Sequence, residues 1–446
     1  MSLSPKQFIT NIFSKNNSTA RNLLIVASIT LLGKFLGFFK ETYIASSFGL
    51  SLVLDTFFIA ILVPGFIQNV FLGAFKGVFI PNYVAELKRG NNPASFQATG
   101  FLITIVTSAI FVLIAYLITD TFLETLFPDH DELFYSMIKT QFYYLAPCIF
   151  LWGISSLLSG MLNIKGEFVY SSLPSFFIPI ITILFLKFFK EELGYNVLAI
   201  GTLVGSLFGI AFLIFICLKK QIIFISKPNI KDANVQLMLK QVPAKVSSGF
   251  LTGMNSVVDQ YFAAQLLVGS IAAINYGQKI PAFLIGILVV ALNNVLLPKF
   301  SSMFIDNQRK AFGSYLKMIK ILFVASTICA TVGILFSDFL VELFYERNKF
   351  TAEDSSIVST MQKIFLIHTP FTICGMVVVN FLTSINKNAF MAYSSLAALI
   401  LNIILDYFFI QYFGILGIAI CTSVVIILKM IVTFWYSIRV SKTFAI

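Results

Sequence analysis

Ionisable side chains lie inside long apolar runs of this 446-residue chain. On insertion scales, one charge at the centre of a membrane helix costs about 2.5 to 3.5 kcal/mol, so a residue kept there is expected to face a cavity and serve a function. Lys34, Lys40 and Asp55 lie in the first two runs, and Lys279 lies in the eighth. Lysine ammonium groups in a water-filled chamber would hold an anionic headgroup, such as a pyrophosphate, by charge-assisted hydrogen bonds.

Lys34 and Lys40 are six residues apart, which is about 9 Å along a helix and roughly a third of a turn in direction. Both could therefore line one wide cavity. The alternative for Lys40, and for Lys76 in the second run, is that a long side chain close to the interface reaches water without further function. Asp55 is expected either to pair with one of the lysines and set its position or to contact the substrate.

The second half of the chain has oxygen-bearing side chains in its apolar runs. Asn402 and Asp406 are spaced i and i+4, so both lie on one helix face, and Asp259 and Thr422 lie in other runs. Carboxylate, amide and hydroxyl oxygens that converge in a dry site favour a hard cation, which indicates Na⁺ or a proton in a transporter. The alternative is that Asp406 lies near the outer interface and only caps or hydrates there.

The helices that must position these residues follow from composition and run length. Of all residues 58% are hydrophobic and 11% are charged, against about 25% charged in soluble domains. The apolar runs approach the 20 residues that a helix needs to cross the hydrocarbon core. They centre on residues 22–46, 52–80, 97–119, 137–162, 170–188, 196–218, 240–264, 268–297, 313–337, 360–384, 391–410 and 413–437.

We therefore predict an all-α polytopic membrane protein with about twelve transmembrane helices, in two six-helix lobes around a central cavity. Basic residues follow most even-numbered runs, which predicts that both termini are cytoplasmic. The predicted divisions are a cytoplasmic N-terminal segment, an N-lobe, a basic cytoplasmic linker, a C-lobe and a cytoplasmic tail: 1–21, 22–218, 219–239, 240–437 and 438–446. The net charge of +11 is explained by basic loops rather than by nucleic-acid binding.

Other kinds of chemistry lack the residues that they need. The five cysteines fall inside apolar runs without metal-ligand spacing, so we expect buried thiols rather than disulfides or a zinc site. No nucleophile–base set or nucleotide-binding loop is evident, so we do not expect an enzyme. The polar start of the chain predicts no cleaved signal peptide.

Three segments resemble the MviN/MurJ lipid II flippases, a bacterial inner-membrane family: Gly33–Glu41 (GKFLGFFKE), Leu54–Phe58 (LDTFF) and Leu292–Pro298 (LNNVLLP). That family belongs to the multidrug/oligosaccharidyl-lipid/polysaccharide exporter superfamily, whose two lobes alternate between inward and outward openings. The resemblance implies that Lys34, Lys40 and Lys279 match the family's cavity arginines. Ile67–Asn69 holds no base where the family has an arginine pair, so another polyprenyl-linked glycan stays an alternative to lipid II.

The resemblance also extends to the cation site. It implies ligands matching five residues here: Asp259, Asn402, Asp406, the backbone of Ile418, and Thr422. We therefore expect a flippase that moves a polyprenyl-pyrophosphate-linked saccharide to the outer leaflet, with no cofactor unless Na⁺ is the coupling ion. Glycan-synthesis enzymes of the cell envelope are its expected partners. Two alternatives stay open: a cation-coupled multidrug exporter on the same scaffold, and a non-transporting membrane scaffold for glycan assembly.

Overall fold

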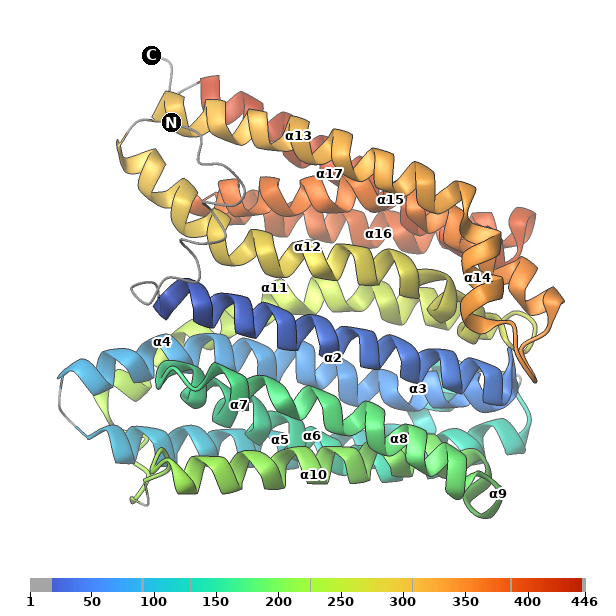
Figure 1. Ribbon diagram of the computed structural model, residues 1–446, viewed down its shortest axis with the longest axis horizontal. Helices are drawn as coiled ribbons and strands as arrows, with labels where there is room; N and C mark the ends of the chain where they lie inside the picture. The colour runs from blue at the N-terminus through green and yellow to red at the C-terminus, as the bar shows by residue number, and fades with distance from the viewer. Residues whose placement is uncertain are drawn as a thin grey trace. The chain divides into compact units, whose positions relative to one another are not determined.

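The computed structural model describes residues 18–89, 92–128, 130–224, 226–306, 308–385 and 387–442. Within them the chain consists of helices joined by turns and by one longer non-helical segment between Lys219 and Ala233, with no β-strand (Figure 1). Nine helical stretches in this part of the chain are long and apolar enough to cross a bilayer. The predicted all-α polytopic fold is confirmed. The count of twelve stays a prediction, because the predicted spans 22–46, 240–264 and 268–297 are not among the nine.

The first half of the chain begins with α2 and ends with α10. Two of its predicted spans are each divided into several helices, and each division lies at a π-helical or 3₁₀ turn. Its elements are α2 (Ser18–Phe48), α3 (Leu52–Ile67), η1 (Gln68–Leu72), α4 (Gly73–Arg89), α5 (Pro93–Leu126), α6 (Glu132–Ile164), α7 (Phe168–Ser172), η2 (Leu173–Phe176), α8 (Phe177–Phe188), α9 (Lys190–Leu193), η3 (Gly194–Asn196) and α10 (Val197–Lys219).

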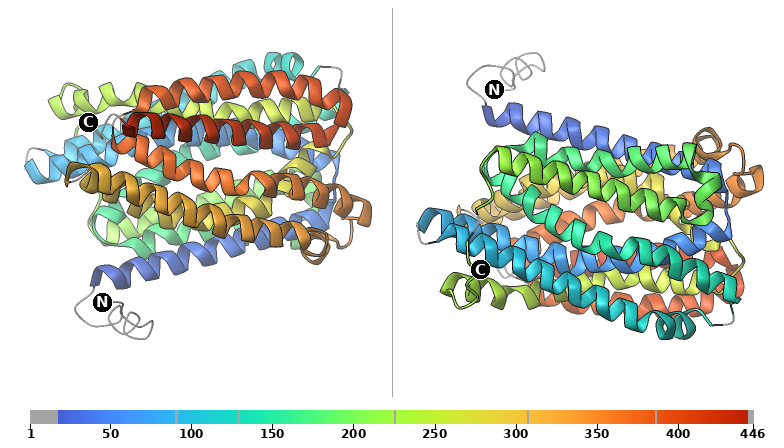
Figure 2. Two further views of the ribbon diagram at one scale, coloured as in Figure 1. Left: turned by 90° about the horizontal axis from the view of Figure 1, so that it is seen from above. Right: turned by 90° about the horizontal axis from the view of Figure 1, so that it is seen from below.

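The second half has longer uninterrupted helices. They are α11 (Ala233–Ala264), α12 (Ser270–Asp306), α13 (Gln308–Leu335), α14 (Ser337–Tyr345), α15 (Ala352–Ser384), α16 (Asn388–Phe413) and α17 (Ile415–Lys442). Helices α12, α13 and α17 all pack against α15, as the further views also show (Figure 2). Most of the predicted segment 1–21 and the end of the predicted tail 438–446 lie outside the described residues.

The chain forms two compact units. The first comprises Met1–Glu41, Ala60–Asp120 and Ser136–Val246, and the second comprises Thr42–Ile59, Thr121–Tyr135 and Ser247–Ile446. The predicted lobe bounds of 22–218 and 240–437 stay a prediction.

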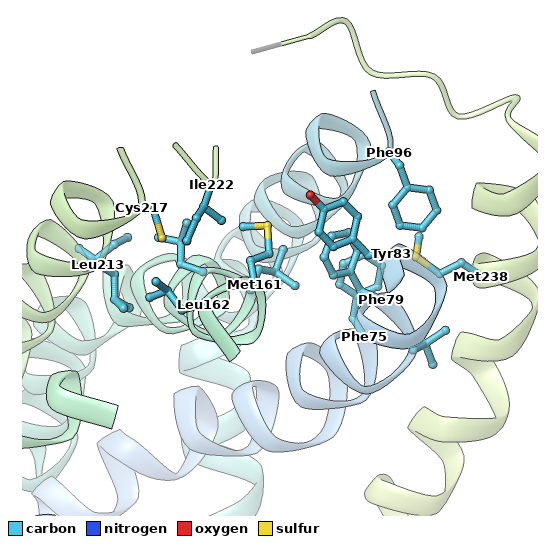
Figure 3. Packing of buried hydrophobic residues seen from close by; sticks show 14 of the residues in the cluster. Phe75, Phe79, Tyr83, Phe96, Met161, Leu162, Leu213, Cys217, Ile222 and Met238 are labelled. Carbon is cyan, nitrogen blue, oxygen red and sulfur yellow. The ribbon is translucent and has the colours of Figure 1, made fainter. Parts of the chain in front are cut away.

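An aromatic stack forms part of the core of the first unit (Figure 3). The rings of Phe79 and Tyr83, one turn apart on α4, have centroids 5.5 Å apart and are nearly parallel. Phe96, at the start of α5, packs on both rings at 5.6 and 6.1 Å. Burial of three such rings stabilises this corner by several kcal/mol, at about 1.5–3 kcal/mol for each fully buried side chain.

The basic segment after α10 packs closely on the α4–α5 corner of the first unit. Ile222 is buried there, and the Gln97 amide donates to its carbonyl at 2.8 Å. The Gln97 side-chain oxygen accepts from the Phe224 amide at 2.7 Å. Glu86, which is 1% exposed, accepts from the Asn234 side chain at 2.6 Å. The predicted linker is therefore held by buried polar contacts and by the ion pair of Lys220 with Glu167 at 2.6 Å.

The core of the second unit is organised around Tyr315 of α13. Its ring stacks on Phe381 of α15 with centroids 4.2 Å apart, and its hydroxyl forms a 2.7 Å hydrogen bond with Ser437 of α17. A buried tyrosine needs such a partner, because an unpaired hydroxyl out of water costs about 1–3 kcal/mol. This one side chain therefore links three helices.

Large apolar side chains cover outer faces of several helices, including α5 and α13. Examples are Leu113, Leu117, Ile321, Ile328 and Leu335, which are 57–75% exposed. Exposure of this much apolar surface to water is unfavourable, whereas its contact with lipid tails is not. Four of the five cysteines are buried, but Cys329 on α13 is exposed, so the expectation of burial is wrong for that thiol.

Candidate functional site

The first unit contains an open cavity of about 520 Å³ next to Lys34, with many polar residues in its lining. Thr30, Gly33 and Lys34 of α2 line it, with Gln68 of η1 and Trp152 of α6. Lys34 is half-buried, as expected for a charge that reaches the cavity from a membrane helix. Hydroxyls complete the lining: Ser155, Ser156, Ser159, Ser171, Ser172 and Ser175.

Local backbone features bring these groups together. Gln68 begins the π-helical turn η1, and single π-turns within helices commonly occur at functional sites. The short helix α7 passes into a 3₁₀ turn at Pro174, which places serines of α7 and η2 on the cavity wall. A Cβ at Gly33 would lie 2.8 Å from the Ser175 hydroxyl, so α2 passes close to this turn and a side chain at position 33 would force that hydroxyl to move.

Most of the serine hydroxyl protons are already used within the protein. Ser156 donates to the Gly153 carbonyl at 2.8 Å, and Ser171 and Ser172 donate to the Phe168 carbonyl at 2.8 and 3.0 Å. Ser175 donates to the Ser172 carbonyl at 2.8 Å. A hydroxyl that donates in this way keeps two lone pairs, so these serines offer hydrogen-bond acceptors rather than donors.

Lys40 has a partner within the first unit. Its ammonium lies 2.7 Å from the carboxylate of Glu41, and the two side chains are 18% and 13% exposed. In this ion pair the negative charge of Glu41 offsets the positive charge of Lys40. The predicted substrate role of Lys40 stays a prediction.

Asp55 belongs to the second unit, where its carboxylate lies at the start of α12. It accepts the backbone N–H of Gly269 at 2.6 Å and of Ala272 at 2.8 Å, and the side chain is 5% exposed. A carboxylate at a helix N-terminus satisfies free amides and interacts favourably with the helix dipole. Gly269 has φ +92°, a conformation that favours glycine, and this turn presents the amides to Asp55. The predicted role of Asp55 toward a lysine or the substrate stays a prediction.

Asp55→Asn is expected to lower the stability of the protein by about 1–2 kcal/mol, because the amide keeps the shape of the side chain but loses its charge and one acceptor. The measurement is the thermal unfolding midpoint of the detergent-purified protein. Asp338→Asn is the matched control, since Asp338 pairs with Lys363 at 2.7 Å but is 69% exposed. Equal midpoints for Asp55→Asn and the wild type would exclude the capping role.

Lys279 lies on α12 of the same unit, beside aromatic rings. Its ammonium is 5.7 Å from the centroid of the Phe58 ring, a cation–π distance. The ring of Tyr276, one turn earlier, is nearly perpendicular to the Phe58 ring, with centroids 6.1 Å apart. Lys279 and Lys34 belong to different units, and both are half-buried lysines on predicted membrane helices.

The structure brings four of the predicted cation-site residues together in the second unit. The Asn402 amide group donates to Asp406 at 3.1 Å and approaches Asp259 at 3.4 Å, and Thr422 donates to Asp259 at 3.2 Å. Asp259, Asn402 and Asp406 are at most 6% exposed. Ile418 is buried one turn before Thr422 on α17.

Two buried oxygens of this cluster have no hydrogen-bond partner among the described residues: Asn402 Oδ1 and Asp406 Oδ1. Orphaned acceptors at such depth are uncommon and fit a ligand that takes electron pairs, such as a cation. Cys421 also belongs to the cluster, with its sulfur 3.3 Å from the Asn402 amide nitrogen. The described residues contain no group of three or more His, Cys, Asp and Glu side chains that could hold a metal ion.

The two helical units have the fold of a membrane transporter of the exporter superfamily named above. A solved structure of the lipid II flippase MurJ in an inward-closed conformation matches with a TM-score of 0.80 at 22% identity, over 93% of this chain and 87% of that one. An inward-facing multidrug transporter of the superfamily matches with a TM-score of 0.68 at 14% identity, over 95% and 98%. These matches establish the fold.

The sequence identifies the family. The family described as Lipid II flippase MurJ matches residues 44–445, so the chain belongs to that family and is a multi-pass membrane protein. A probable lipid II flippase MurJ of Buchnera aphidicola (Schizaphis graminum) is 25% identical, over 93% of this chain and 82% of its own length. One from Aquifex aeolicus is 27% identical, over 79% and 70%.

Proposed function

We propose that this protein moves a polyprenyl-pyrophosphate-linked saccharide, lipid II or a related glycan precursor, from the inner to the outer leaflet by alternating access. The observation that carries the proposal is Lys34, with serine and glutamine side chains, at the wall of a cavity within an apolar membrane unit. Its relatives are named as probable lipid II flippases. The polyprenyl tail stays in lipid while the headgroup crosses, so the protein offers a polar path and catalyses no chemical step.

Lys34, Lys40 and Lys279 are the cations assigned to the pyrophosphate in this proposal, because ammonium groups form strong charge-assisted hydrogen bonds with phosphate. Asp55 contributes by fixing the start of α12, nine residues before Lys279. The bacterial inner membrane is the proposed location, with both termini in the cytoplasm as the loop charges predict. Glycan-synthesis enzymes are the proposed partners.

Na⁺ is the proposed coupling ion at Asp259, Asn402, Asp406, Thr422 and the Ile418 backbone. The orphaned oxygens of Asn402 and Asp406 support this assignment. In the present arrangement the amide nitrogen of Asn402 lies between the two carboxylates. A half-turn of that amide would direct its oxygen toward them instead, and three oxygens around one point suit a cation. A bound Na⁺ would supply the positive charge that two buried carboxylates need.

Reconstitution in proteoliposomes tests the function. We expect the headgroup of labelled lipid II, or of another polyprenyl-pyrophosphate glycan, to cross faster than in protein-free liposomes. A Na⁺ gradient should increase the rate, and Lys279→Ala should lower it. Failure of folded wild-type protein to move either lipid would contradict the proposal, and movement of one lipid only would identify the substrate.

A further inference from the structure

The beginning of α13, in the second unit, is strongly basic. It carries four exposed cations and no acidic residue: Arg309, Lys310, Lys317 and Lys320. Lys317 and Lys320 form no ion pair with any residue in the described part of the chain. We infer that this surface binds the headgroup of an anionic phospholipid in the inner leaflet, a role separate from the proposed transport.

The cations continue the lipid-facing side of the helix. Lys310 and Lys317 are seven residues apart, so they lie on one face of α13. Ile321 and Ile328 follow in the same row, and their side chains are 57% and 60% exposed. Tyr315 marks the opposite side, which is buried in the unit. Lys310 and Lys317 therefore face the surrounding lipid rather than the protein.

The length of α13 and its contact with α17 place this end of the helix at the membrane interface. The 28 residues of α13 span about 42 Å, whereas the hydrocarbon core is about 30 Å thick, so the helix reaches into the headgroup layer. The hydrogen bond between Tyr315 and Ser437 gives the start of α13 and the end of α17 the same depth. Trp435 of α17 is 59% exposed, with Arg439 at 5.6 Å from its ring. An exposed tryptophan beside a cation is typical of the membrane interface.

The deeper lysines are expected to direct their charges into the same layer. Long side chains on a helix point toward its N-terminus, and α13 begins at this end. The ammonium groups of Lys317 and Lys320 should therefore extend toward Arg309 and Lys310, while their methylene stems cover apolar surface. This brings the positive charges together at the level of the lipid phosphates.

The charge cluster is unfavourable unless an anion neutralises it. Cations at a helix N-terminus are repelled by the helix dipole, and Lys317 and Lys320, at i and i+3, repel each other. A phosphodiester would offset both effects through charge-assisted hydrogen bonds. Basic clusters at the end of a membrane helix are typical of anionic-lipid recognition. A free phosphate would supply the charge alone, whereas a phospholipid also has acyl chains that match the apolar row at Ile321 and Ile328.

The test compares two membranes with the full-length protein in nanodiscs. The unfolding midpoint is measured in phosphatidylcholine alone and in its mixture with phosphatidylglycerol. The double variant Lys317→Gln/Lys320→Gln should be at least as stable as the wild type in phosphatidylcholine, because it removes the repulsion, and less stable than the wild type in the mixture. Its affinity for phosphatidylglycerol, measured by native mass spectrometry in detergent, should fall about thirtyfold, since each lysine near an anionic lipid contributes about 1 kcal/mol.

Lys88→Gln/Lys231→Gln is the matched control, because both lysines are exposed but belong to the first unit. It should keep the wild-type response to phosphatidylglycerol. An equal gain in midpoint from phosphatidylglycerol in the wild type and in Lys317→Gln/Lys320→Gln, or no gain in the wild type, would overturn the lipid site. A loss of affinity confined to polyprenyl pyrophosphate would assign this surface to the transport substrate and would also overturn the phospholipid assignment. These readouts do not depend on transport, so the proposed function is tested separately.

Discussion

Translocation of the lipid-linked headgroup is expected to fall at least about tenfold in Lys34→Ala, because one charged hydrogen bond to the substrate is worth about 1.5–3 kcal/mol. Lys34 is the lysine among the residues that line the cavity of the first unit, so its loss removes the charge at that wall. Lys34→Arg keeps a cation and adds a forked donor, and it should retain most of the rate. The measurement is the initial rate of headgroup movement in proteoliposomes.

Lys88→Ala is the control for the removal of one positive charge. Lys88 lies near the end of α4, is exposed, and does not line the cavity. The rate of this variant should match that of the wild type, and the unfolding midpoints of all variants should agree. A Lys34→Ala protein that translocates at the wild-type rate would exclude Lys34 from headgroup binding.

Much of the fold could be predicted from the order of residues. The cluster of Asp259, Asn402, Asp406 and Thr422 could be predicted as well, but the serine-lined cavity could not. Apolar runs of membrane-spanning length predict helices, because backbone groups in lipid must be paired within the segment. Asn402 and Asp406 share a helix face by their spacing, and polar groups in an apolar environment must meet others. That reasoning joins them to Asp259 and Thr422, and the four side chains do lie together.

The serine-rich cavity could not be predicted in the same way. A serine in a membrane helix commonly bonds to its own preceding carbonyl, so Ser155 and Ser159 carry no evident sign of a cavity in their spacing. The direction of the Gln68 side chain depends on a π-helical turn, which the order of residues does not indicate. The partners of Asp55 are backbone amides more than 200 positions along the chain. The charge of Lys34 within an apolar run makes it a candidate site residue from sequence alone. The neutral residues around it carry no such signal.

Sodium should stabilise the wild-type protein against heat, and Asp406→Asn should abolish that effect. A ligand bound only by the folded state adds about 2.7 kcal/mol when it is present at 100 times its Kd. Asp406 is fully buried, and one of its oxygens has no hydrogen-bond partner among the described residues. A bound cation would therefore stabilise this carboxylate strongly. The measurement is the unfolding midpoint in NaCl and in choline chloride at equal ionic strength and pH.

The asparagine variant keeps the shape of Asp406 and can still accept from Asn402, so it should fold and should still bind lipid without a gradient. Its transport should no longer respond to Na⁺, and Asp259→Asn should behave alike, because both carboxylates approach the same Asn402 amide. Asp338→Asn, which removes an exposed carboxylate, should leave the Na⁺ response intact. A wild-type protein with equal midpoints in both salts, and a transport rate that follows a proton gradient instead, would show that the buried carboxylates exchange protons. The orphaned oxygens would then be explained by protonation of one carboxyl group, since a neutral acid can donate where a carboxylate only accepts.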